Sequence, residues 1–116
     1  MKPRPLYGFF KRGSSWVFSL VRKDSVGAAI PLDQVNAYSA IFRSDSIDGN
    51  ILITMNGTNG LSIPTPANGT IVVNLSPTQT VLFKAGTKVY FDVKLTYVDT
   101  SVWQSPTYYI VADKEV

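Results

Sequence analysis

The sequence contains no cysteine and no histidine among its 116 residues. Without cysteine, the chain has no thiolate nucleophile, no cysteine-ligated zinc and no iron–sulfur cluster. Without histidine, it lacks the commonest general base and the commonest ligand of transition metals. A domain of this length buries enough apolar surface to fold without a disulfide or a metal. We therefore expect a non-enzymatic protein with no catalytic residue, no metal and no cofactor.

Charged residues are also scarce. They make up 16% of the chain, below the usual quarter, and such a surface suits a protein that works inside an assembly. No apolar run approaches the ~18 residues of a membrane-spanning helix. The opening "MKPRPLYGFF" is broken by prolines and a glycine, unlike a secretory leader. We expect a protein made in a cytoplasm, without contact with a membrane.

The net charge of +3 is concentrated at the N-terminus. Four of the first 12 residues are basic, whereas the rest of the chain carries seven basic and eight acidic side chains. Pro3 and Pro5 favour an extended backbone, so the sequence predicts an N-terminal arm over residues 1–13 and one domain over 14–116. The arm's apolar and basic side chains indicate docking on a neighbouring subunit, and a disordered tail is the alternative. The expected partner-binding residues are Leu6, Tyr7, Phe9, Phe10, Lys11 and Arg12.

The rest of the chain has the alternation of apolar and polar residues that is typical of β-strands. The clearest case is "KVYFDVKLTYV", in which every second side chain from Val89 is apolar. Glycine, proline and Asn-Gly turns separate the segments. About seven short strands with such spacing predict a single antiparallel β-sandwich. The expected strands lie at 14–21, 36–45, 50–55, 61–63, 70–75, 88–98, 102–104 and 107–112.

One short helix is predicted near 77–84, between two strands. Ser76 can cap it, with Pro77 at the first helical position and Gln79 spaced to complete a capping box. Gly86 is placed to end the helix in the left-handed conformation. Two turns are too short to be stable alone, so we expect Val81, Leu82 and Phe83 to pin the helix over the open end of the sandwich.

Other candidate sites have an ordinary structural explanation. Asp45 and Asp48 lack the further ligands of a calcium loop, and they are expected in a solvated turn. Tyr90, Tyr108 or Tyr109, with Lys88 and Lys94, could stack single-stranded nucleic acid, but the domain has no basic excess, so nucleic acid is not an expected partner. Trp16 and Trp103 could stack on sugar rings, although aromatic residues more often fill a core or an interface.

The segment "GTIVVNLSPTQTVLFKAGTKVYFDVKL" resembles a structural module of tailed bacteriophages, found for instance at the N-terminus of lactococcal phage upper baseplate proteins. In that module a strand ends in a Leu-Ser or Leu-Thr pair, which here is Leu75 and Ser76. A short helix carries a Gln-Thr, here Gln79 and Thr80, and a turn with Gly86 leads into a strand. The likeness is specific in this segment and extends in outline over residues 14–112.

The resemblance implies an immunoglobulin-like β-sandwich without catalytic residues, used as an adaptor or decoration in the virion. We therefore expect a subunit of the neck, baseplate or capsid surface that binds other virion proteins and copies of itself through its arm and sheet edges. The expected location is the virion, after synthesis in the host bacterial cytoplasm. The alternative is a carbohydrate-binding β-sandwich for host-surface glycans, with an exposed tryptophan or tyrosine as its binding platform.

Overall fold

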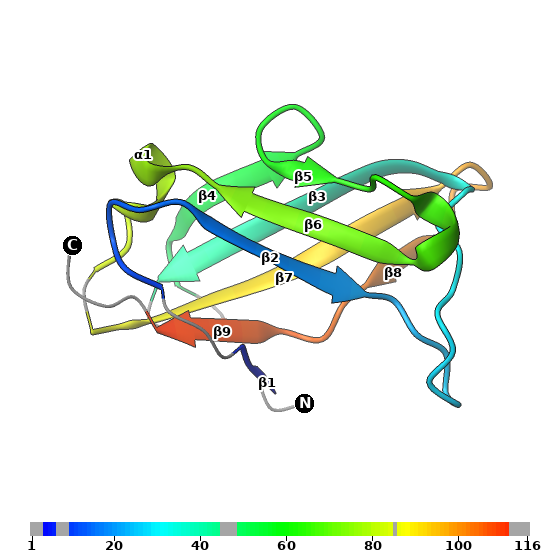
Figure 1. The fold of residues 1–116 in the computed structure, drawn as a ribbon, viewed down its shortest axis with the longest axis horizontal. Coiled ribbons are helices and arrows are strands. Elements are labelled where there is room, and N and C mark those ends of the chain that lie inside the picture. Colours follow the sequence, from blue (N-terminus) through cyan, green and yellow to red (C-terminus); the bar gives the residue numbers. More distant parts are fainter. Residues whose placement is uncertain (1–3, 7–9, 45–48, 85, 112–116) are drawn as a thin grey trace.

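The computed structural model describes residues 4–6, 10–44, 49–84 and 86–111. They form two sheets that face each other (Figure 1). The large sheet has the order β1-β9-β7-β3-β4, with β8 also paired to β7, and the small sheet has the order β2-β6-β5. The strands of the large sheet are β1 (Arg4–Pro5), β3 (Val35–Ser44), β4 (Ile51–Asn56), β7 (Lys88–Tyr97), β8 (Val102–Gln104) and β9 (Tyr108–Val111). The small sheet contains β2 (Trp16–Val21), β5 (Leu61–Ser62) and β6 (Thr70–Leu75), and the short helices are η1 (Pro66–Asn68) and α1 (Pro77–Thr80).

This topology is an immunoglobulin-like β-sandwich, so the predicted all-β fold is confirmed. Neighbouring strands are antiparallel throughout, apart from the parallel pair β1–β9. Each sheet alternates residues that face the core with residues that face outward. The described residues form one strand that the sequence did not predict, β1 in the arm.

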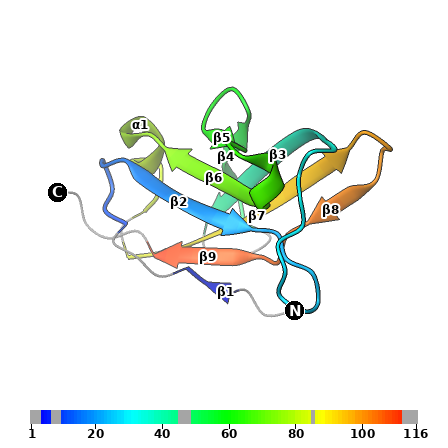
Figure 2. The same ribbon diagram turned by 45° about the vertical axis from the view of Figure 1, so that its right-hand side comes forward.

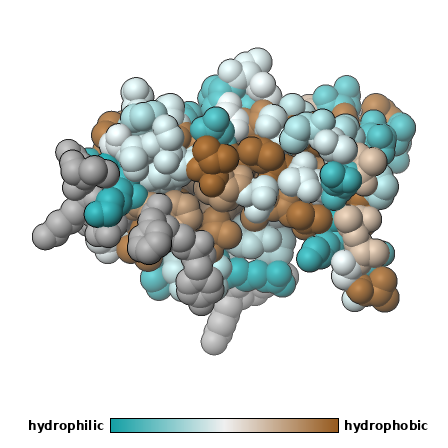
Figure 3. Space-filling view, viewed as in Figure 1, coloured by the Kyte–Doolittle hydropathy of each residue, from teal (hydrophilic) through white to brown (hydrophobic). Residues whose placement is uncertain are grey.

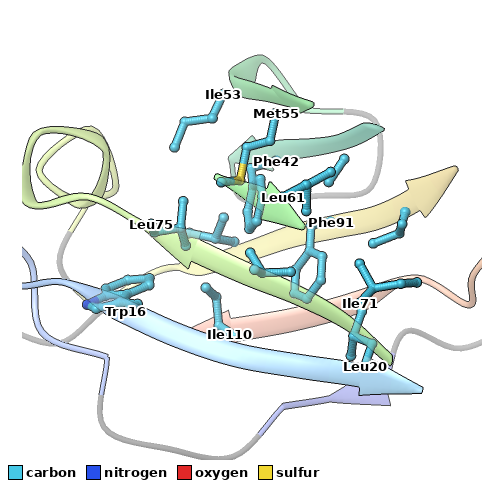
Figure 4. Packing of buried hydrophobic residues seen from close by; sticks show 14 of the residues in the cluster. Trp16, Leu20, Phe42, Ile53, Met55, Leu61, Ile71, Leu75, Phe91 and Ile110 are labelled. Carbon is cyan, nitrogen blue, oxygen red and sulfur yellow. The ribbon is translucent and has the colours of Figure 1, made fainter. Parts of the chain in front are cut away.

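The core lies between the sheets and is rich in aromatic rings (Figure 4). Phe42 of β3 stacks on Phe91 of β7 with ring centroids 4.8 Å apart. Phe18 of β2 reaches the same Phe91 across the sandwich, at 5.5 Å. In antibody domains a disulfide joins the two sheets at their centre. This chain has no cysteine, and aromatic contacts connect its sheets instead.

The helix that follows β6 is shorter than predicted. The capping box is confirmed, because Ser76 and Gln79 bond each other's backbone N–H groups. However, α1 ends at Thr80, and residues 81–83 continue as turns with i→i+3 bonds. Phe83 is fully buried as expected, but the prediction for Val81 and Leu82 is wrong, since their side chains are 41% and 54% exposed. Gly86 has the predicted left-handed backbone, with φ of 78°.

The arm packs on its own sandwich where the structure describes it. The amide N–H of Arg4 donates to the carbonyl of Thr107 at 2.8 Å, and that of Leu6 donates to Tyr109 at 2.9 Å. Phe10 is 8% exposed and meets Trp16 edge to face at 5.1 Å. The sequence divided arm from domain at residue 13, but the hydrophobic core already includes Phe10.

Candidate interaction surfaces

The six arm residues predicted to bind partners have different environments. Leu6 is partly buried against the core, and Phe10 is part of it. Lys11 is exposed, and its carbonyl accepts the indole N–H of Trp16 at 2.6 Å. The guanidinium of Arg12 donates to the carbonyl of Val81 at 2.8 Å. Tyr7 and Phe9 lie outside the described residues. The structure thus brings the described arm residues onto their own domain, and their binding to partners stays a prediction.

Among the described residues, the strands of the small sheet place no charged side chain on their outward side. We call it the uncharged face, and it consists of Val17, Ser19, Val21, Ser62, Thr70, Val72 and Asn74. Val17 is 63% exposed and Val21 is 42% exposed. Figure 3 shows apolar surface across the middle of this side of the molecule. An exposed patch with apolar residues and no charge is typical of a protein contact.

A shallow uncharged hollow continues the uncharged face toward the start of α1. It has a volume of about 380 Å³ and is lined by Asn59, Gly60, Asn74, Ser76, Thr78 and Gln79. None of these side chains is charged, and Asn74 belongs to both surfaces. The hollow is held by local bonds, since the side chain of Asn59 accepts the N–H of Asn56 at 2.6 Å and donates to the carbonyl of Thr54 at 3.0 Å. The uncharged area therefore extends beyond the sheet itself.

The outward side of the large sheet has the opposite character. It brings together Tyr90 and Tyr109, with ring centroids 5.8 Å apart, and the ammonium of Lys88 lies 4.7 Å from the Tyr109 ring. Tyr108 faces inward and stacks on Phe91 instead. Burial raises the pKa of the nearby Asp92 carboxyl, and the charge of Arg43 partly offsets this. Among the described strand residues on this side, Asp92 is acidic, whereas Arg43, Lys88 and Lys94 are basic. The expectation that nucleic acid is not a partner therefore stays a prediction.

A cleft of about 380 Å³ opens between the sheets where β2 ends. Both sheets contribute to its apolar lining, through Leu20, Ile71 and Val93. Three cations, Arg4, Arg22 and Lys23, also line it. Asp24 is the one acidic residue among the described lining residues, and its carboxylate accepts the N–H groups of Val26 and Ala28, both at 3.0 Å. The cleft thus combines apolar side chains with an excess of positive charge.

Arg22 is fixed between two aromatic rings at this cleft. Its guanidinium lies 5.2 Å from the centroid of Tyr97 and 5.0 Å from that of Trp103, and it donates to the Tyr97 hydroxyl. Burial lowers the pKa of Arg22, but an arginine stays charged at neutral pH. Trp103 pairs with the inward-facing Leu95 and packs on the core. The guanidinium of Arg22 covers part of the Trp103 ring.

The tryptophans therefore give little support to a sugar platform. Trp16 is 2% exposed and belongs to the core. Asp45 and Asp48 lie outside the described residues. Within the described part of the chain, no three carboxylate, histidine or cysteine side chains gather to hold a metal ion. The described helices include none that is long and apolar enough to cross a membrane.

Sequence reasoning missed the surfaces around β2. The segment "WVFSLV" has no charge, while Lys11 and Arg12 precede it and Arg22 and Lys23 follow it. This pattern was visible in the sequence, but it indicates an interaction surface only when β2 is known to lie at the edge of its sheet. The stacking of Arg22 between Tyr97 and Trp103 joins residues that are distant in the chain, and no local pattern predicts it.

Comparison with known proteins gives a distant structural likeness. No family model and no curated protein matches the chain. A similar solved structure is the V domain of amphioxus IgVJ-C2, with 13% sequence identity, a TM-score of 0.31, and coverage of 91% of this chain and 99% of that one. The fold assignment stands on the sheet topology described above, and so distant a likeness carries nothing about function.

Proposed function

We propose that this protein is a non-enzymatic structural subunit of a tailed-bacteriophage particle, which contacts neighbouring subunits through the uncharged face. The phage context is supported by the sequence resemblance between residues 69 and 95. The contact is supported by one structural observation: all charged strand residues that the structure describes lie in the large sheet, and the small sheet has none.

Charge placement matters because interface cores exclude charged residues. On the large sheet, Arg43, Lys88 and Asp92 would have to be desolvated if a partner covered them. On the uncharged face, a partner would displace water from valine, serine, threonine and asparagine, at a much lower cost. The small sheet is therefore the side of the sandwich that a neighbour can cover most favourably.

The size of the uncharged face predicts a weak pairwise contact. A stable interface takes roughly 20–30 residues from each partner, whereas the uncharged face and the uncharged hollow together contribute far fewer. Weak contacts become strong when many copies are held in one array, because each further contact is effectively intramolecular. We thus expect a monomer in dilute solution and a stable position inside an assembled particle.

The arm is less suited to binding a neighbouring subunit than the sequence suggested. Phe10 cannot bind a neighbour unless its ring leaves the core, which makes a free grasping arm unfavourable for this residue. Deleting residues 1–12 would remove a core side chain together with the arm. Loss of particle incorporation in that variant would therefore not separate docking from folding.

A substitution on the uncharged face separates an effect on docking from an effect on folding. We propose Val17→Glu, which places a charge at the most exposed valine of β2, and Thr54→Glu as the matched control on the exposed side of β4. Both add one negative charge to a six-residue strand at a sheet edge. Thermal melts should show similar stability for the two purified chains, since surface changes usually cost little.

In particles produced by cells that carry the gene, Val17→Glu should reduce incorporation by at least about tenfold, because a desolvated unpaired charge costs more than 1.4 kcal/mol. Thr54→Glu should be incorporated normally. Equal incorporation of both variants would contradict the role of the uncharged face. Absence of the unmodified chain from such particles would contradict the structural function itself.

A further inference from the structure

The outer edge of β2 combines three features that are rarely found together: length, regularity and lack of charge. Among the described residues, five strands lie at a sheet edge: β1, β4 and β8 in the large sheet, and β2 and β5 in the small sheet. β1 and β5 have two residues each, β8 has three, and β4 has a register shift opposite Phe42 and Arg43. β2 has six residues in unbroken register with β6. Figures 1 and 2 show it at the border of the small sheet.

Edge strands are normally protected against pairing with other chains. Short length protects β1, β5 and β8, and a register shift interrupts β4. Within the described residues, β2 lacks three of these devices, since "WVFSLV" contains no charge, no proline and no bulge. An unprotected edge of this kind is the surface that a further strand can extend.

The register identifies which backbone groups are available. The amide N–H of Arg22 donates to the carbonyl of Gly69, one residue beyond the pair Val21–Thr70. In an antiparallel ladder, hydrogen-bonded residues alternate with residues whose backbone groups point the other way. Phe18 and Leu20 therefore bond β6, whereas the N–H and C=O groups of Val17, Ser19 and Val21 point away from it. These three residues provide the hydrogen-bonding row of the free edge.

The surroundings of the edge determine the chemistry of the incoming strand. The cleft beside the second half of β2 offers apolar surface from Leu20, Ile71 and Val93, next to the cations Arg4, Arg22 and Lys23. At the other end of β2, the exposed Lys11 lies next to Trp16. A complementary segment has apolar side chains in its middle and carboxylates at its ends.

A second copy of β2 fits this edge poorly. In antiparallel self-pairing, Lys11 of one copy would approach Arg22 and Lys23 of the other, and like charges brought together oppose association. In parallel self-pairing, Lys11 would approach Lys11 and Lys23 would approach Lys23. Both arrangements leave the positive charges without a counter-charge.

We propose that the free edge of β2 is a strand-acceptor site, which takes an extended segment of about six residues from another protein, apolar in its centre and acidic at its ends. The segment adds a fourth strand to the small sheet through Val17, Ser19 and Val21, and its inward side chains enter the cleft between the sheets. Its carboxylates face Lys11 at one end and the cluster Arg4, Arg22 and Lys23 at the other. The site uses the backbone groups of three residues whose side chains belong to the uncharged face, and it does not depend on the phage context.

The test uses the full chain and two synthetic peptides, Ac-EEVTVTVEE-NH2 and its charge-reversed counterpart Ac-KKVTVTVKK-NH2. In the unmodified protein, saturating acidic peptide should slow amide hydrogen exchange at Val17, Ser19 and Val21, and leave Phe18 and Leu20 almost unchanged. This alternation distinguishes strand addition from general stabilisation, which would slow all five amides. The basic peptide should leave all of them unchanged.

Two sets of variants test the contacts. Ser19→Pro removes an edge donor but no ladder bond to β6, and proline is tolerated on such edges; it should weaken peptide binding about fivefold or more, as loss of one net hydrogen bond implies. Lys11→Glu with Lys23→Glu should weaken binding by about tenfold at low salt. The matched control, Lys88→Glu with Lys94→Glu, has the same change in net charge at exposed positions on the outward side of the large sheet and should change the affinity less than twofold.

Four results would overturn the proposal: no binding of the acidic peptide at millimolar concentration, equal binding of the two peptides, protection without the alternation along β2, or equal effects of the two double variants. A concentration-dependent dimer that Ser19→Pro dissociates would also overturn it, in favour of pairing between two copies of this chain. If Ser19→Pro fails to fold, the exchange pattern of the unmodified protein and the two double variants still decide the outcome.

Discussion

Replacing Phe10 by alanine tests whether the start of the chain is a structural part of the sandwich. The ring is 8% exposed and meets Trp16 at 5.1 Å and Phe18 at 6.0 Å, both edge to face. Replacing a core phenylalanine by alanine costs about 3–5 kcal/mol, and each aromatic pair accounts for about 0.5–1.5 kcal/mol beyond burial. Phe10 lies at the border of the core, where neighbours can relax, so we expect a loss at the lower limit, about 3 kcal/mol.

The assay is equilibrium unfolding in urea, followed by tryptophan fluorescence, together with thermal melts. For a domain of this size a loss of 3 kcal/mol corresponds to a fall in Tm of about 12 °C. Leu82→Ala is the control, because that side chain is 54% exposed and should cost less than about 1 kcal/mol. If Phe10→Ala also costs less than about 1 kcal/mol, the ring does not belong to the core in solution, and the arm is free to bind partners as the sequence suggested.

Three further substitutions test the packing and the electrostatics. Thr80→Val should cost about 2 kcal/mol in urea unfolding, since the buried hydroxyl accepts from one backbone group before β2 and donates to another, both at 2.9 Å; the exposed Thr78→Val should cost almost nothing. Gly60→Ala should cost about 3 kcal/mol by the same assay, because φ is 131° and a Cβ would lie 2.5 Å from the carbonyl oxygen of Asn74. Asp92→Asn should raise stability at neutral pH, because burial raises the pKa of this carboxyl and the charged form is therefore the unfavourable one in the folded state. In the unmodified chain, the raised pKa stabilises the folded state while Asp92 is protonated, and this stabilisation is lost as pH rises from the usual aspartate range through the folded pKa. The free energies of unfolding of the unmodified chain and of Asp92→Asn should therefore converge at about pH 3 and differ most above the folded pKa. A difference that is largest in acid would contradict this explanation.

The sequence predicted the strands well because each one is buried on a single side. In β7, Val89, Phe91, Val93 and Leu95 are buried while Lys88 and Lys94 are exposed, which reproduces the alternation seen in the letters. The capping box at Ser76 was predictable for a similar reason, since all its groups lie within four residues. Local chemistry determines features of this kind.

Features that depend on distant partners were not predicted. Basic and proline residues made residues 1–13 look like a free arm, but Phe10 is buried by Trp16 and Phe18, which follow it across a turn. The length of α1 was overestimated because apolar residues at 81–83 suggested a further turn, whereas only Phe83 finds a place in the core. The cleft and the free edge of β2 depend on the order of strands in the sheets, and the alternation of a single strand says nothing about its neighbours.

Quantitative mass spectrometry of particles purified from cells that carry the gene measures the structural role most directly. If the protein is a particle subunit, the chain should be present in a fixed ratio to the other particle proteins, in several copies per particle, and should stay attached after high-salt washing. Its absence from such particles, or a trace amount that washing removes, would contradict the account.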